Sequence, residues 1–246
     1  MKLTSLILTL LFIHHLLLAY EPVAIISKFR GKVKHKLVSD NKYRTNAHLN
    51  TPIFSDSQIK TKKGAFSKVV YLDDGSAISI YPDTEVKVQG VVNNRMILKQ
   101  VDLIKGIIQV NVTNQAAGEF KLVTPSSEVK CKKCNFWVIS DGLNGDQFIQ
   151  ESGNAELFNA SVNRRMELVS DSTIISNENN EFEIIKTPIT EAKFLESLML
   201  DADEKIYEYN INQPEEPNAD TITNIVVIRL KNAANIEREI VVTYTQ

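Results

Sequence analysis

Two cysteines three residues apart are the side chains with the most versatile chemistry in this chain. Cys131 and Cys134 are its only cysteines. Such a pair can form a disulfide, exchange thiols or contribute to a metal site. In an oxidising compartment a single pair favours one disulfide. Residues three apart on a straight strand, however, lie about 10 Å from each other and on opposite faces. A bridge therefore requires a bulge or turn, and two free thiols are the alternative.

A redox or metal role has less support. The cysteines lie in the segment EVKCKKCNFWV, which is typical of a strand, whereas redox pairs stand at the start of a helix. Zinc would need more ligands, and beyond residue 20 only His35 and His48 remain, without ligand spacing. We therefore expect neither a metal nor another cofactor.

Two acidic segments offer oxygen atoms that could bind calcium. They are residues 73–76 (DDGS) and residues 141–146 (DGLNGD). Neither follows the twelve-position pattern of a calcium-binding loop, and these residue types are the ordinary ones of tight turns. Both segments are interpreted as turns.

Recognised catalytic motifs are missing from the sequence. The chain has no Gly-x-Ser-x-Gly elbow, no phosphate-binding glycine loop and no His-Glu-x-x-His. A carboxylate pair for glycoside hydrolysis would leave no distinctive spacing. We expect a protein that is not an enzyme.

One aromatic residue and a group of lysines suggest binding instead. Trp137 alternates with Phe136 along a predicted strand, so one of them is expected in the core and the other on the surface, where it could stack on a ligand. Lys60, Lys62 and Lys63 belong to a basic region, residues 25–70. They are expected to protect sheet edges or to attract an acidic partner, including the acidic C-terminal part of this chain. Nucleic acid is not expected, because aromatic residues do not alternate with the lysines.

A series of short predicted strands positions these residues. The clearest part is 64–88, where apolar and polar residues alternate on both sides of the 73–76 turn. Short alternating segments recur between residues 23 and 176, separated by turns. Among them, 96–112 is expected to form two strands broken at residues 105–106, and 148–150 and 155–158 to flank a turn. This recurrence predicts an all-β sandwich, barrel or solenoid.

The N-terminus resembles an export signal. Residues 1–19 combine a positively charged start, an apolar stretch and Ala19 before the expected cleavage position, as in a secretory signal peptide. An uncleaved anchor is the alternative, although the apolar stretch at 3–18 is shorter than the roughly 20 residues needed to span a bilayer. We expect a periplasmic or secreted protein with no stable membrane span after cleavage.

The C-terminal part departs from the β pattern. Thr187 and Pro188 are a helix-start signal, and an amphipathic helix is expected within 187–209, its apolar stripe docked on the β-domain. Residues 210–220 are expected to form a linker, and 221–246 a terminal β-hairpin. Because two strands alone are marginally stable in water, this hairpin should add to a sheet or to a partner.

The ordered series of strands and turns resembles the FecR domain family over about residues 23–169. The matching positions share the family's order of glycine turns and alternating apolar residues. They are Gly31; Asp56, Ile59 and Thr61; Leu72, Asp74, Gly75, Ser76, Ile78, Ile80, Pro82, Thr84, Val86 and Val88; Leu103, Gly106, Ile108, Val110 and Val112; Phe120, Leu122, Thr124, Pro125 and Val129; Phe136 and Val138; and Glu151, Gly153, Ala155 and Leu157.

The resemblance implies a periplasmic β-domain of solenoid-like or sandwich-like character that acts in interaction or sensing. Two departures matter. Lys133 and Cys134 replace a Gly-Thr pair, and only a signal-like segment precedes the domain, where family members that transduce iron-uptake signals have a cytoplasmic anti-sigma segment. Direct control of a sigma factor is therefore not expected.

Together, these features predict an exported, non-enzymatic module that binds a protein or an envelope component through strand edges and the basic N-terminal face. A carbohydrate-binding or structural module of the envelope is the alternative. It would require exposed aromatic residues in a groove.

Overall fold

The computed structural model describes residues 21–45, 47–115, 118–141, 145–177, 182–209, 223–231 and 237–245. The chain divides into two compact units, Met1–Tyr207 and Glu208–Gln246. The predicted signal peptide (1–19) and linker (210–220) lie outside the described residues.

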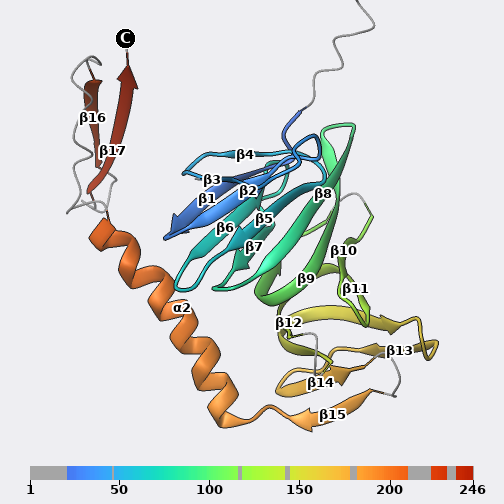
Figure 1. Cartoon of the computed structure of the whole chain (residues 1–246). Coiled ribbons are helices and arrows are strands. Elements are labelled where there is room, and N and C mark those ends of the chain that lie inside the picture. Colours follow the sequence, from blue (N-terminus) through green and yellow to red (C-terminus); the bar gives the residue numbers. More distant parts are fainter. Residues whose placement is uncertain are drawn as a thin grey trace, which may run out of the picture. The chain divides into compact units, whose positions relative to one another are not determined.

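The first unit contains a 15-stranded sheet followed by one described helix (Figure 1). The strands are β1 (Ala24–Arg30), β2 (Val33–Lys36), β3 (Arg44–Thr45), β4 (Pro52–Ile53), β5 (Ser57–Thr61), β6 (Phe66–Tyr71), β7 (Ala77–Ile80), β8 (Glu85–Asn93), β9 (Met96–Val112), β10 (Phe120–Val123), β11 (Glu128–Ser140), β12 (Asp146–Asn159), β13 (Arg164–Glu167), β14 (Ser172–Ser176) and β15 (Glu183–Lys186). The helix is α2 (Ile189–Tyr209). The mostly β architecture confirms the predicted fold class.

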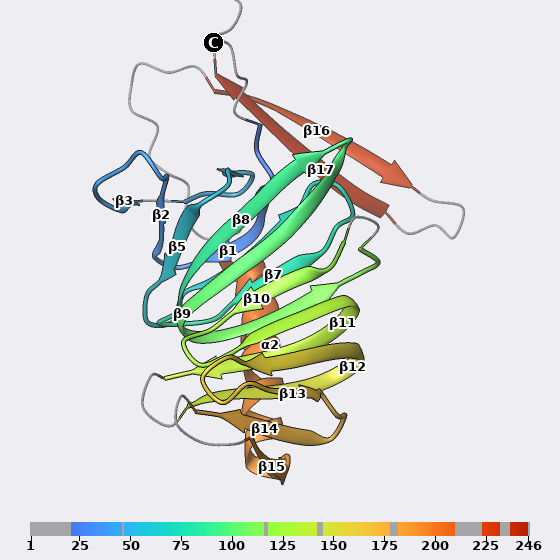
Figure 2. The same ribbon diagram turned by 90° about the vertical axis from the view of Figure 1, so that its right-hand side faces the viewer.

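Three long strands bend, and each half of a bent strand pairs with at least one strand that the other half does not (Figure 2). The first half of β9 pairs with β8, and the half after Gly106 pairs with β7 and β11. Strand β11 pairs with β10 before its bend at Cys131 to Cys134 and with β9 after it. Strand β12 pairs with β14 before Gly153 and with β13 after it. The sheet therefore folds over on itself at these bends.

The main core lies between the parts of the sheet that the bends bring face to face. Ile59 and Val86, on β5 and β8, are fully buried in one cluster with Ile78 and Val110, on β7 and β9. This packing explains the two-residue alternation of the sequence, since every second side chain points into the cluster. Polar residues on the intervening positions face outward.

Helix α2 covers part of the outer face of the sheet. Its buried residues Leu195 and Ala202 pack in a second cluster with Phe66, Tyr81 and Trp137. At the far end of the helix, Asp201 forms an ion pair with Arg30 of β1 at 2.5 Å. The helix therefore docks on the β-domain through both apolar and charged contacts. No helix among the described residues has the length and apolar character to cross a membrane.

Docking of α2 can be followed with the single tryptophan of the chain. Replacing Leu195 by Ala opens a void beside Trp137, and we expect a red shift of the emission and stronger quenching by acrylamide, because the helix loosens. Leu200→Ala is the matched control, since Leu200 is 58% exposed. Identical spectra for the Leu195 variant and the wild type would contradict this packing.

Two strand predictions were wrong in the same way. Residues 96–112 form one strand that bends at Gly106, where two strands were expected. Residues 146–159 likewise form one strand, although a turn was expected at 152–154. In both cases glycine with positive φ bends the strand without ending it.

The second unit contains an antiparallel hairpin of β16 (Thr223–Lys231) and β17 (Glu237–Thr245). Its register places Val226 opposite Val242 and Ile228 opposite Ile240.

Candidate functional site

Three exposed lysines lie on two neighbouring turns and form what we call the basic corner: Lys32, Lys62 and Lys63. The turns are held together because the amide of Lys62 donates to the carbonyl of Lys32 at 3.1 Å. They also pack tightly, since a Cβ on Gly31 would lie 3.2 Å from the Cα of Ala65. The corner therefore presents positive charges on a rigid scaffold.

Lys60 does not belong to this corner. Its ammonium group pairs with Glu85 at 2.6 Å and lies 5.7 Å from the ring centre of Tyr43. The Tyr43 hydroxyl donates to the same carboxylate at 2.5 Å. Burial raises the pKa of Tyr43, and its hydrogen bond to Glu85 raises it further. Of the three predicted interaction lysines, the structure brings Lys62 and Lys63 together and places Lys60 in an internal ion pair.

Trp137 and Phe136 are both buried, although one of the two was expected on the surface. Trp137 faces away from Phe136, as the alternation predicted, but it is only 1% exposed because α2 covers it. Its ring lies 4.9 Å from that of Tyr81, and its Nε1 donates to Glu151 at 2.5 Å. With α2 in place, this side chain offers no open surface for stacking on a sugar ring.

A groove of about 690 Å³ lies between the first half of α2 and the sheet. Trp137, Ile149, Leu195 and Met199 contribute apolar lining, and Lys186 and Lys193 are among its charged residues. The acidic groups Glu151, Asp171 and Glu196 also line it. The groove therefore has no single charge sign to select an ion.

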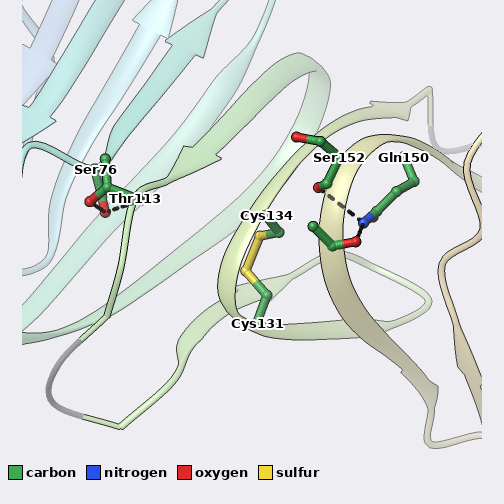
Figure 3. Close-up of a disulfide and its surroundings, with 7 residues drawn as sticks. Ser76, Thr113, Cys131, Cys134, Gln150 and Ser152 are labelled. Carbon is green, nitrogen blue, oxygen red and sulfur yellow. Dashed lines mark hydrogen bonds between the residues drawn. A yellow bond between two sulfur atoms is a disulfide. The ribbon is translucent and has the colours of Figure 1, made fainter.

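The cysteines lie at the bend of β11 and form a disulfide (Figure 3). A register shift between Cys131 and Lys133 shortens the Cα separation to 6.2 Å, which supplies the bulge that a bridge requires. On the facing strand, Gln150 Nε2 donates to the carbonyls of Ser152 (3.1 Å) and Gly153 (2.6 Å). Gly153 is needed there, since a Cβ would lie 2.3 Å from the Lys133 oxygen. A second register shift, between Asn135 and Phe136, follows a few residues later in the same strand pair.

We expect thiol titration of the denatured, unreduced protein to find no reactive cysteine. After reduction, two thiols per chain should appear. The bridge closes a very short loop, so its loss should cost only about 2 kcal/mol. Two reactive thiols before reduction would contradict the bridge.

The acidic turn at residues 73–76 holds a buried lysine in place of a metal. Lys99 Nζ lies 2.7 Å from Asp73 and 2.9 Å from Asp74, and its side chain is 1% exposed. The turn is fixed by further bonds, from the Ile97 amide to Asp73 (2.8 Å) and from the Ser76 amide to Asp74 (2.8 Å). Within the described ranges, no three His, Cys, Asp or Glu side chains gather as metal ligands would.

Acid should destabilise the fold by protonating carboxylates that accept hydrogen bonds and pair with lysines in the folded state. Burial alone would raise the pKa values of Asp74, Glu85 and Glu128, but hydrogen bonds and neighbouring lysines outweigh burial and lower them. Their contribution is complete above the unfolded pKa, about 4, and is lost as pH falls through the lower folded values. Urea unfolding should give a smaller free energy at pH 3 than at pH 6, and equal values would contradict these pKa shifts.

Lys99 and Glu151 have structural roles that were not predicted from the sequence. Lys99 stands at every second position with Ile97 and Val101, which are both buried, so the alternation of its strand is a signal of its burial. Glu151 accepts hydrogen bonds from Trp137 and from Asn135 (2.5 Å). These residues come together because β11 pairs with β12, which the local sequence does not show. The two acids before the Gly-Ser turn were a second signal of a buried cation.

One family model matches part of this chain. Residues 57–151 match the family model described as FecR protein. Two crystal structures from Parabacteroides distasonis, provisionally described as anti-sigma factors, are also similar. One has 19% identity and a TM-score of 0.46, covering 55% of this chain and 62% of that one. The other has 18% identity and a TM-score of 0.47, covering 61% and 74%. A search of curated proteins found no match.

Proposed function

We propose, from the premise that residues 57–151 are a FecR domain, that the chain is an exported, non-enzymatic sensing module that binds a protein of the cell envelope. The family match is the observation that carries this proposal. Export is inferred from the signal-like residues 1–19. The resemblance of the sequence to the FecR family supports export, because it implies a periplasmic domain.

The basic corner is the surface that we assign to the partner. Its lysines are exposed on turns fixed by backbone contacts, so they can meet an acidic surface without reordering. Such charges mainly accelerate encounter and select partners. Lys62 and Lys63 lie within the family match, and Lys32 lies beside them. A carbohydrate-binding role has lost its main support, because Trp137 is buried.

The test is capture of a crosslinked partner from cell envelopes with the full chain, followed by identification by mass spectrometry. The double variant K62E/K63E should reduce capture about tenfold, and high salt should do the same. K132E/K133E is the matched control, since these two neighbouring lysines are also exposed but lie at the bend of β11. Equal capture by both variants, or capture that does not weaken at high salt, would refute the basic corner as the binding surface.

A further inference from the structure

Lysines stand opposite one another along the paired strands β2 and β5, in an arrangement that we call the lysine ladder. Lys34 of β2 is directly opposite Lys60 of β5. The pairing continues past the strand ends to Lys32 and Lys62, because the Lys62 amide donates to the Lys32 carbonyl at 3.1 Å. Steps of two residues keep these side chains on one face of the sheet. The ladder consists of Lys32, Lys34 and Lys36 along β2 and of Lys60 and Lys62 along β5.

The face that carries the lysine ladder is turned away from the core and from helix α2. Val33 and Ile59, which alternate with the lysines, are buried in the main core. The helix packs on another part of the sheet, around Trp137, and in Figure 2 it lies behind the sheet while β5 and β8 lie in front. Lys32 and Lys62 are exposed, and the other lysines of the ladder are partly exposed. The ladder is therefore open to a partner.

Most of the positive charge on the ladder is not balanced within the fold. Glu85 offsets Lys60, at 2.6 Å. Lys34 and Lys36, like the pair at the end of the ladder, form no ion pair with any residue that the structure describes. Like charges directly opposite each other destabilise a sheet. The ladder therefore keeps a repulsion that a bound anion would relieve.

The repeat of the ladder matches that of an extended peptide. Successive lysines along β2 are two residues apart, which is about 6.6 Å on a strand. A peptide in extended conformation presents every second side chain on one face with the same repeat. The outward positions of the two strands hold Lys34, Lys36, Gln58 and Lys60 and no apolar side chain. Protein interfaces usually have an apolar core, so recognition here would depend on charge and spacing.

We propose that the lysine ladder binds an extended acidic segment of the partner protein, with Asp or Glu at every second residue. This inference rests on the proposed function, because it names what the partner presents to the basic corner. It also extends the contact from the corner along β2 to Lys34 and Lys36. Carboxylates above these lysines replace the repulsion between like charges with charge-assisted hydrogen bonds.

The test compares two labelled peptides of equal composition and charge by fluorescence anisotropy with the full chain. One alternates Glu and Ser, and the other repeats the block Glu-Glu-Ser-Ser. We expect the alternating peptide to bind about tenfold more tightly and to be released as salt rises. Equal affinities would overturn the proposal. Binding of polygalacturonate, an acidic polysaccharide, without binding of either peptide would also overturn it.

The double variant K34Q/K36Q tests the ladder without changing the basic corner. It should bind the alternating peptide about tenfold more weakly than the wild type, whereas the control K132Q/K133Q, at the bend of β11, should bind it normally. Thermal unfolding of K34Q/K36Q should not occur at a lower temperature, because repulsion is removed. Unchanged peptide affinity would overturn the proposal. Envelope capture that depends on Lys62 and Lys63 but not on Lys34 and Lys36 would overturn the ladder alone, and capture that depends on neither pair would overturn the proposed function as well.

Discussion

Replacing Lys99 by methionine is expected to lower the free energy of unfolding by about 3–5 kcal/mol, the usual cost of removing one partner from a buried ion pair. Methionine keeps the length of the side chain but leaves Asp73 and Asp74 without their shared cation. The loss would be a large part of the roughly 5–15 kcal/mol that stabilises a typical domain. Urea unfolding followed by circular dichroism would measure it.

Lys87→Met is the matched control for this prediction. Lys87 pairs with Asp102 at 2.8 Å on the outer face of the sheet, where both side chains are partly exposed. An exposed pair contributes about 1 kcal/mol or less. Adding Asp73→Asn and Asp74→Asn to the Lys99 variant should recover part of the loss, because the uncompensated charges disappear. Similar losses for the Lys99 and Lys87 variants would contradict a buried ionic centre.

Replacing Gly106 by alanine is expected to cost about 3 kcal/mol or more, through backbone strain and overpacking together. Gly106 has a φ of +108°, and a Cβ there would lie 2.5 Å from the Cα of Thr84. Thr84 cannot move freely, because the Ile107 amide donates to its hydroxyl at 2.9 Å and its own amide donates to Thr61 at 3.0 Å. The bend that lets β9 pair with two sets of neighbours should therefore be lost or strained.

Gly64→Ala separates the two contributions. Gly64 also has a positive φ, +69°, but a Cβ at this position would have no neighbouring atom within 4 Å. Only the backbone strain remains there, about 1 kcal/mol. Comparable thermal unfolding of the two variants would show that the close approach of Thr84 to the β9 bend is not important.

The fold class could be predicted because apolar and polar residues alternate along each strand. Ile78, Val110 and Val138 each stand at every second position of their segments, and all three are fully buried in the main core. The bends could not be predicted in the same way. Whether Gly106 ends a strand or bends it depends on the strands that lie beside it, which the local sequence does not contain.

The candidate site likewise has features that could be predicted from the sequence and features that could not. Lys62 and Lys63 were assigned to a basic region that would protect sheet edges or attract an acidic partner, and the structure shows that both are exposed. Trp137 was assigned to one face of its strand, but its burial depends on a helix more than fifty residues later in the chain. The cysteine bulge, likewise, depends on Gly153 of the facing strand.

Crosslinking in living cells tests the central claim most directly. A photoreactive amino acid is placed at Lys63, and in a separate control at Lys133, in the full chain. We predict a discrete adduct with an envelope protein from position 63 that is missing from position 133. Identical adducts from both positions, or none from position 63, would contradict a FecR-type module that binds a protein through the basic corner.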